Sequence, residues 1–217
     1  MLKAIIFDFD YTLGDSTNGI ALSINYALGK LGYATPNIAD IKKTIGLSLT
    51  ETYFALTSND DLYEAEQFIS LFKEKADSVM VTNTELYAGV KGVLQKLKAK
   101  GYMTAIVTTK FHYRIEQILN KFNANELIDI IVGAEDVKIV KPNPEGLLWA
   151  IENLGAMKEE VLYVGDSLVD AKTAENAKVK FVAVLTGTTT KDDFESYNSM
   201  YIGNNISDVY KYVLALE

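Results

Sequence analysis

The chain has 217 residues, of which 48% are hydrophobic and 23% charged, a composition typical of a globular protein with a substantial core. Its formal net charge of −8 argues against a nucleic-acid partner, because no surplus of lysine and arginine is available to neutralise phosphates. The lack of cysteine excludes disulfides and thiolate chemistry. The sequence contains neither a signal-peptide pattern nor the roughly 18 consecutive apolar residues of a membrane span, so we expect a cytoplasmic protein.

The first predicted element is a strand over residues 3–9, KAIIFDF, whose nearly continuous apolar run is typical of a strand covered on both faces. Asp8 and Asp10 stand at its carboxyl end. Two carboxylates in this position either cap and solvate a turn or hold a cation for chemistry.

Residues 15–85 are predicted to form a helical module, because apolar residues recur there with a 3.6-residue period and no clear strand pattern intervenes. Ser48 and Glu51, in the segment SLTE, form a capping-box pattern that predicts the start of a helix. The helical patterns cover residues 23–35, 38–46, 48–56 and 62–80.

From residue 86 onward, apolar β-rich runs alternate with amphipathic helical patterns, which indicates a parallel sheet with helices on both faces. Strands are predicted at 103–108, 128–133, 161–166 and 180–186, and helices at 90–101, 113–122 and 144–155. In the last of these helices we expect Trp149 to face the core. The predicted fold class is α/β, with a doubly wound, mostly parallel sheet interrupted after its first strand by the helical module.

Polar residues follow the other predicted strands in the same way as the aspartates follow the first. Thr108 and Thr109 end the second β-rich run, Asp166 ends the VLYVGD run, and Asp170 follows four residues later. Lys141 precedes a helix start in VKPNPE. Because ligands of open α/β sheets bind at the carboxyl ends of the strands, all of these residues can converge on one crevice.

Each residue also has a purely structural interpretation. Asp10 could cap a turn, Thr108 could simply suit a strand end, and Asp170 could cap the helix that SLVD begins. Lys141 could be a solvated lysine beside a proline turn. These interpretations leave unexplained why every strand end carries a matching group and why mutually repelling carboxylates should gather.

A hard divalent cation would offset that repulsion, and Mg²⁺ binds one or two carboxylates together with water and phosphate oxygens. A lysine and a threonine hydroxyl beside it form a phosphate site. An aspartate next to the metal can act as a covalent nucleophile, and a second aspartate can protonate the leaving oxygen and later activate water. We therefore predict phosphate chemistry with Mg²⁺ as the cofactor.

Four stretches in this order resemble the motifs of the haloacid dehalogenase-like (HAD) hydrolase superfamily, within its phosphoglycolate phosphatase-like group. They are DFDYTL, IVTTK, VKPNPE and GDSLVDAKTA. The resemblance implies a Rossmann-like catalytic core at residues 1–14 and 86–217 and a helical cap at 15–85. It further implies a Mg²⁺-dependent phosphatase that acts on small phosphomonoesters through an aspartyl-phosphate.

The resemblance also implies a role for each matching residue. Asp8 would be the nucleophile and Asp10 the general acid/base, with the Asp10 backbone carbonyl also facing Mg²⁺. Thr108 would bind the transferring phosphoryl group with Thr109 beside it, and Lys141 would neutralise the phosphate. The expected metal residues are Asp8, Asp10, Asp166 and Asp170.

Two further residues are expected to face the substrate. Tyr11 stands where relatives usually carry glycine. Its ring either narrows the phosphate pocket or touches the cap, or else it lies against the core or hinge. Gly46 belongs to IGLSLTE, which resembles the turn of the cap that faces the substrate. The dehalogenases of the superfamily lack the second aspartate, so the presence of Asp10 disfavours dehalogenation.

The expected partner is a small phosphorylated metabolite, with phosphoglycolate as the leading candidate and the protein either a monomer or a homodimer. The alternatives within the fold are a sugar phosphomutase similar to β-phosphoglucomutase, a pyrophosphatase and a nucleotidase. A receiver-like phospho-signalling or binding module is the alternative outside enzymes. The Asp-x-Asp spacing, the position of the lysine before the last acidic pair and the helical insert all disfavour a receiver.

Overall fold

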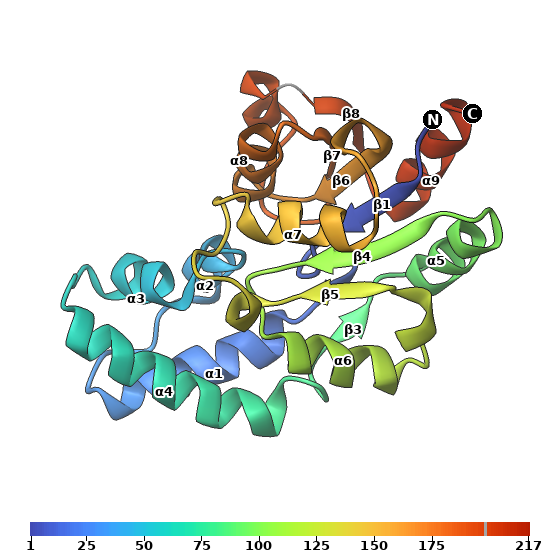
Figure 1. Ribbon diagram of the computed structural model, residues 1–217. Coiled ribbons are helices and arrows are strands. Elements are labelled where there is room, and N and C mark those ends of the chain that lie inside the picture. Colours follow the sequence, from blue (N-terminus) through green and yellow to red (C-terminus); the bar gives the residue numbers. More distant parts are fainter. Residues whose placement is uncertain (198) are drawn as a thin grey trace. The chain divides into compact units, whose positions relative to one another are not determined.

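The computed structural model describes residues 1–197 and 199–217, and these form two compact units (Figure 1). The first unit contains Met1–Asp15 and Leu86–Glu217, and the second contains Ser16–Glu85. The predicted roles of the two units, catalytic core and cap, are not decided by this division and remain predictions.

The first unit is built on a parallel sheet that has six strands within the described residues. Its strand order is β5-β4-β1-β6-β7-β8, and every neighbouring pair is parallel. The strands are β1 (Ala4–Phe7), β4 (Met103–Val107), β5 (Ile130–Val132), β6 (Val161–Gly165), β7 (Lys180–Val184) and β8 (Ser199–Gly203). This confirms the predicted α/β class with a mostly parallel sheet.

Helices cover both faces of this sheet (Figure 1). One face packs against α7 (Glu145–Asn153) and α8 (Leu168–Ala177), and α5 (Val90–Ala99) packs with α9 (Ile206–Ala215) on the other. Within its described residues the unit also contains β2 (Gly14–Asp15), α6 (His112–Lys121) and 3₁₀ turns at Asn125–Leu127, Ala134–Asp136, Lys158–Glu160 and Asp192–Ser196. Alternate residues of β1 face the two layers, with Ala4 and Ile6 in the core beneath α7 and α8.

The expectation for Trp149 was wrong, because its side chain is 47% exposed. The residues of α7 that enter the core are Leu147, Ala150 and Ile151. At 100° per residue, Trp149 lies on the opposite side of the helix from Leu147 and Ile151. Proximity in sequence to apolar residues was therefore a poor guide to the buried face.

The second unit consists of four helices, with β3 (Glu85–Leu86) at the return of the chain to the first unit. The helices are α1 (Thr17–Lys30), α2 (Ile38–Thr44), α3 (Leu49–Thr57) and α4 (Leu62–Val79). Helix α1 packs on α4, and Ile24, Leu28 and Phe68 contribute to their shared core. Ser48 accepts a hydrogen bond from the Glu51 amide, so the predicted capping box begins α3.

None of the helices in the described part of the chain has the length and apolar character needed to cross a membrane.

Candidate active site

The candidate active site lies in the first unit, where β1, β4 and β6 are neighbours and end at the same edge of the sheet. Asp8 directly follows β1, Thr108 follows β4, and Asp166 follows β6. The Asp8 amide still donates to the Val164 carbonyl (2.8 Å), which extends the pairing of the two strands to the site. The parallel register therefore brings residues from distant parts of the sequence to one edge.

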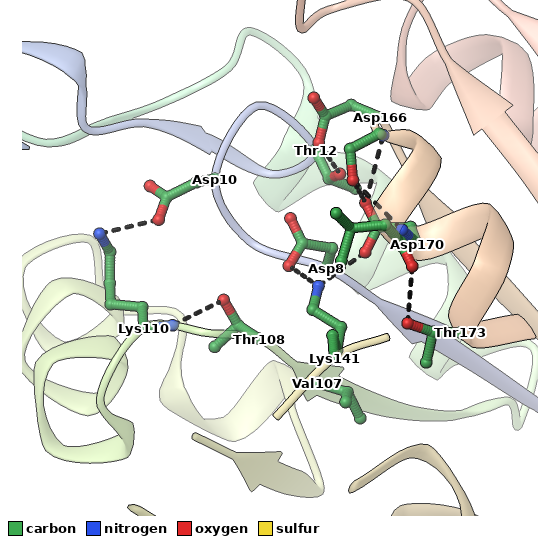
Figure 2. Close-up of polar contacts among 12 residues, drawn as sticks. Asp8, Asp10, Thr12, Val107, Thr108, Lys110, Lys141, Asp166, Asp170 and Thr173 are labelled. Carbon is green, nitrogen blue, oxygen red and sulfur yellow. Dashed lines mark hydrogen bonds and ion pairs between the residues drawn. The ribbon is translucent and has the colours of Figure 1, made fainter. Parts of the chain in front are cut away.

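Lys141 is the centre of a buried polar cluster (Figure 2). Its Nζ donates to Asp8 Oδ1 and to Asp170 Oδ1, each at 2.6 Å, and to the Tyr163 hydroxyl at 3.2 Å. The Tyr163 hydroxyl in turn donates to Asp170 Oδ1 at 2.9 Å. Lys141 and Asp170 are thus fixed by each other and by a strand residue, so the ammonium group is held against the Asp8 carboxylate.

Asp166 lies beside this cluster and is held from two sides. The Thr12 hydroxyl donates to its Oδ1 at 3.3 Å. On the other side, an ideal Cβ built at Gly187 would lie only 1.8 Å from Asp166 Oδ2. The backbone at Gly187 therefore approaches the carboxylate more closely than any residue with a side chain would allow.

Burial changes the acidity of these groups. Desolvation, opposed by Lys141 and reinforced by Asp170, raises the pKa of Asp8 from its ordinary 3.8 to about 7. Desolvation, followed by the charges of Asp170 and Asp8, also raises the pKa of Asp166 well above its ordinary value. Burial lowers the pKa of Lys141, but the carboxylates of Asp170 and Asp8 outweigh it and raise that pKa well above its ordinary value.

The cluster fits a divalent cation. Asp8, Asp166 and Asp170 are buried, and each offers a carboxylate oxygen within 4.8 Å of the others. Lys141 supplies one positive charge to these three carboxylates, and a hard cation with oxygen ligands would supply the rest. Asp170 already bonds Lys141 through Oδ1 and Ser167 through Oδ2, so Asp8 and Asp166 are the better placed to hold the ion.

The carboxylate of Asp10 faces a different partner. Its Oδ2 forms an ion pair with Lys110 Nζ at 2.8 Å, and Figure 2 shows it directed toward that lysine. The Lys110 amide donates to the Thr108 hydroxyl at 3.2 Å. The carboxylate cluster that could bind a metal does not include Asp10, so metal contact through its backbone carbonyl remains a prediction.

The other expected substrate residues have different surroundings. Tyr11 is 6% exposed and has a left-handed backbone with φ of +61°. Its carbonyl accepts a hydrogen bond from the Thr186 hydroxyl. Thr109 is half-buried beside Thr108. Gly46, with φ of +100°, belongs to the helical unit.

Several residues of the site were not anticipated from the sequence. They are Thr12, Lys110, Tyr163 and Gly187. Tyr163 carried the clearest signal, because it is the one hydroxyl-bearing residue in the strand VLYVG. A buried tyrosine hydroxyl needs a hydrogen-bond partner, so its presence in a strand covered on both faces points to polar neighbours.

Comparison with known proteins shows the family to which this chain belongs. A family model described as haloacid dehalogenase-like hydrolase matches residues 5–184, a span that contains all of the site residues except Gly187. The chain belongs to the haloacid dehalogenase-like hydrolase family. It is therefore an enzyme of this family, and the resemblance inferred from its motifs is confirmed.

The chain is similar in sequence to two relatives that bear the name of a pyrophosphatase. The pyrophosphatase PpaX of Bacillus mycoides is 31% identical over 208 residues, which cover 96% of this chain and 95% of that protein. The pyrophosphatase PpaX of Halalkalibacterium halodurans is 30% identical over 213 residues, again 96% of this chain and 95% of the relative.

Solved structures of haloacid dehalogenase-like hydrolases have the same fold. One from Bacteroides fragilis has a TM-score of 0.94 and 40% sequence identity, and the match covers 96% of this chain and all of that one. A predicted phosphoglycolate phosphatase from Haemophilus somnus has a TM-score of 0.86 and 27% identity, with 98% of each chain covered.

Proposed function

We propose that this protein is a Mg²⁺-dependent phosphatase of small phosphorylated molecules that works through an aspartyl-phosphate on Asp8. The observation that carries the proposal is the contact between Asp8 and Lys141 within a buried set of carboxylates suited to a cation. Family membership favours this hydrolytic chemistry and does not favour a receiver-like module.

In the proposed mechanism, Asp8 attacks the phosphorus atom and Lys141 neutralises negative charge. Asp8 attacks phosphorus through a carboxylate oxygen, and Lys141 holds that carboxylate in position while it neutralises phosphate oxygens. Thr108 donates its hydroxyl hydrogen to the phosphoryl group. A bound Mg²⁺ would neutralise charge on the phosphoryl oxygens and lower the pKa of Asp8.

Asp10 moves the proton in both halves of the reaction. In the first, the leaving oxygen takes a proton from Asp10 as its bond to phosphorus breaks. In the second, water attacks the phosphorus of the aspartyl-phosphate while Asp10 accepts a proton from that water. Phosphate is released and the Asp8 carboxylate is regenerated.

The proposed substrates are small phosphorylated metabolites, with phosphoglycolate and pyrophosphate as the two candidates. The Haemophilus somnus structure bears the name of a phosphoglycolate phosphatase. The pyrophosphatases PpaX are similar over nearly the whole chain, which favours pyrophosphate as the second candidate. Within this proposal, Tyr11 and Gly46 contribute to substrate selection, Asp8 and Asp166 hold the metal, and Asp170 supports the site through Lys141.

The test is phosphate release by the purified protein with Mg²⁺ from a panel containing phosphoglycolate, pyrophosphate, nucleotides and hexose phosphates. We expect turnover of at least one member, loss of turnover in EDTA, and an acid-stable phosphate on Asp8 detected by mass spectrometry. Asp8→Asn should abolish turnover with an unchanged circular dichroism spectrum. Asp60→Asn, which changes an exposed carboxylate of the helical unit, is the matched control and should be active.

Two outcomes would contradict the proposal. A wild-type protein that is inert across the whole panel would exclude a general phosphatase. Conversion of a hexose phosphate into its isomer without phosphate release would instead identify a sugar phosphomutase.

A further inference from the structure

Lys110 and Asp10 form an ion pair that is almost completely buried. Lys110 Nζ lies 2.8 Å from Asp10 Oδ2, and the two side chains are 5% and 10% exposed. A long lysine side chain loses considerable conformational freedom when it is fixed in this way, and both ions lose hydration. Such a pair therefore fixes the orientation of the carboxylate rather than simply adding stability.

The backbone that carries Lys110 is itself held on both sides. The Lys110 amide donates to the Thr108 hydroxyl at 3.2 Å, and the Lys110 carbonyl accepts from the Ala134 amide at 3.1 Å. Lys110 lies three residues after the end of β4, the strand next to β1. Its ammonium group consequently reaches Asp10 from a fixed support on the neighbouring strand.

The two oxygens of Asp10 have different surroundings. Lys110 binds Oδ2, whereas Oδ1 is buried and has no hydrogen-bond partner among the described residues. A buried acceptor without a partner is unfavourable, and the exceptions in native proteins call for an explanation such as a catalytic role. Oδ1 is thus the oxygen left to bond a substrate or a water molecule.

We propose that Lys110 is a positioning residue that fixes Asp10 so that Oδ1 is the atom that exchanges the proton. The proposal rests on the proposed phosphatase function. When Asp10 carries the proton on Oδ1, its Oδ2 still accepts the hydrogen bond from Lys110. The same pairing therefore serves Asp10 both as an acid and as a base.

The proton and electron movements balance in both halves of the reaction. During cleavage, the O–H bond at Asp10 Oδ1 breaks, and the proton joins the leaving oxygen, which keeps the electron pair of its former bond to phosphorus. During hydrolysis, the water oxygen bonds to phosphorus and its proton passes to Asp10 Oδ1. The electron pair of the bond between Asp8 and phosphorus returns to the Asp8 carboxylate.

The experiment compares Lys110→Met with Lys110→Arg on two substrates that differ in their need for an acid. The leaving group of p-nitrophenyl phosphate departs readily without protonation, whereas that of an alkyl phosphate needs the proton. We expect Lys110→Met to lower kcat/KM for the alkyl phosphate by about 10- to 100-fold, since a small displacement of a catalytic group costs up to ~10²-fold. For p-nitrophenyl phosphate the cleavage step should be nearly unchanged.

Breakdown of the aspartyl-phosphate needs Asp10 as a base with either substrate. Lys110→Met should therefore show a burst of nitrophenolate followed by slow turnover, as phosphorylated Asp8 accumulates. Lys110→Arg, which keeps the positive charge, should recover part of the rate. Adding Lys110→Met to Asp10→Asn should cause little further loss, because the lysine acts through Asp10. Lys138→Met, which alters an exposed lysine in the same unit, is the control and should behave as the wild type.

The outcomes separate this inference from the proposed function. A wild type that is inactive on both substrates and on the whole panel described above contradicts the phosphatase function itself. An active wild type combined with equal losses on the two substrates, no burst, or a change in KM alone contradicts the positioning role of Lys110. A change in KM alone would show instead that Lys110 binds an anionic group of the substrate.

Discussion

At Gly187 the backbone lies against the carboxylate of Asp166. Any side chain there would begin with a Cβ 1.8 Å from Asp166 Oδ2, which is far inside van der Waals contact. The φ of Gly187 is not in the left-handed region, so the need for glycine comes from space and not from backbone conformation. The residue therefore acts on the site by leaving room for a carboxylate.

Gly187→Ala should displace Asp166 and weaken the metal site while the fold is retained. We expect the Mg²⁺ concentration for half-maximal activity to rise by about 10- to 100-fold, the usual effect of disturbing a group that supports a metal ligand. Activity measured against Mg²⁺ concentration checks this.

Gly92→Ala is the matched control. It lies in α5, where a new Cβ meets no atom within 4 Å, and it should stabilise the protein by about 0.5–1 kcal/mol without changing the Mg²⁺ requirement. Equal Mg²⁺ requirements for Gly187→Ala and the wild type would show that Asp166 does not hold the ion.

At Tyr11 an unfavourable backbone conformation is combined with a favourable burial of the side chain. Its left-handed backbone costs about 1–2 kcal/mol for a residue with a side chain, which explains why glycine suits this turn. Burial of its ring returns about 1.5–3 kcal/mol. The two effects nearly offset each other, so a tyrosine is compatible with the turn on physical grounds. These two free-energy contributions do not bear on the proposed role of Tyr11 in substrate selection.

At the level of elements, the side chain of Asp170 connects helix α8 with the candidate active site. Asp170 Oδ2 accepts hydrogen bonds from the amide and the hydroxyl of Ser167, which completes a capping box at the start of α8. Asp170 Oδ1 accepts from Lys141 and Tyr163. The capping interpretation of Asp170 is therefore confirmed through Oδ2, whereas Oδ1 contacts Lys141 and Tyr163 and its role at a metal stays a prediction.

Ser167→Ala and Asp170→Asn should separate these two contributions. Ser167→Ala removes only the cap and should lower the free energy of unfolding by about 1 kcal/mol while activity stays within a few-fold of wild type. Asp170→Asn removes the negative charge that faces Lys141 and should lower kcat at least about 10-fold, because the ammonium loses a charged hydrogen-bond partner. Chemical denaturation and steady-state kinetics on both variants provide the test. Equal losses of activity would mean that the helix start, and not the charge, controls the site.

At the scale of the whole molecule, we expect the buried carboxylates to make stability depend on pH and, if the proposed ion binds, on Mg²⁺. The pKa of Asp8 rises on folding from 3.8 to about 7, first through burial, and that of Asp166 rises well above its ordinary value. A raised pKa means that the folded protein binds protons more tightly than the unfolded chain. The stability gained from protonated Asp8 is therefore fully present below about pH 3.8 and is lost as the pH rises through about 7, and Asp166 contributes in the same direction.

In EDTA, we expect the unfolding temperature to fall between pH 5 and pH 8. Added Mg²⁺ should raise it, and by more at pH 8 than at pH 5, because the ion binds the ionised carboxylates and stabilises only the folded chain. Differential scanning fluorimetry at several pH values checks both trends. Asp8→Asn should show a flatter pH dependence and a smaller response to Mg²⁺. A response to Mg²⁺ that is the same at every pH and in both proteins would contradict this linkage.

Much of the fold followed from apolar patterning. Nearly continuous apolar runs, which are typical of strands buried on both faces, predicted the strands β1, β4, β5, β6 and β7. Strand β8 and helix α9 were not anticipated. In β8 the sequence SMYIG is short and lies at the edge of the sheet, where Met200 is 47% exposed, so no continuous apolar run marks it.

The candidate site was predictable where residues stand at strand ends. Asp8, Thr108 and Asp166 could be placed together because parallel neighbouring strands end at one edge. Lys110 could not be recognised, because a lysine after a strand is usually solvated, and its burial depends on contacts with a distant segment. Gly187 follows β7 in a loop where nothing local indicates that a carboxylate from β6 fills the adjacent space.

The position of β1 in the middle of the sheet has a consequence for synthesis on the ribosome. This strand is made before its two partners, β4 and β6, which begin only at residues 103 and 161. Helices α1 and α4 pack together within residues 17–79, so the helical unit can complete its core much earlier. During translation the Asp8 segment must wait with an unpaired apolar strand until β4, Lys141, which is 133 residues away, and β6 have been made. The nascent chain therefore carries Asp8, the proposed nucleophile, long before it can assemble the candidate site around it.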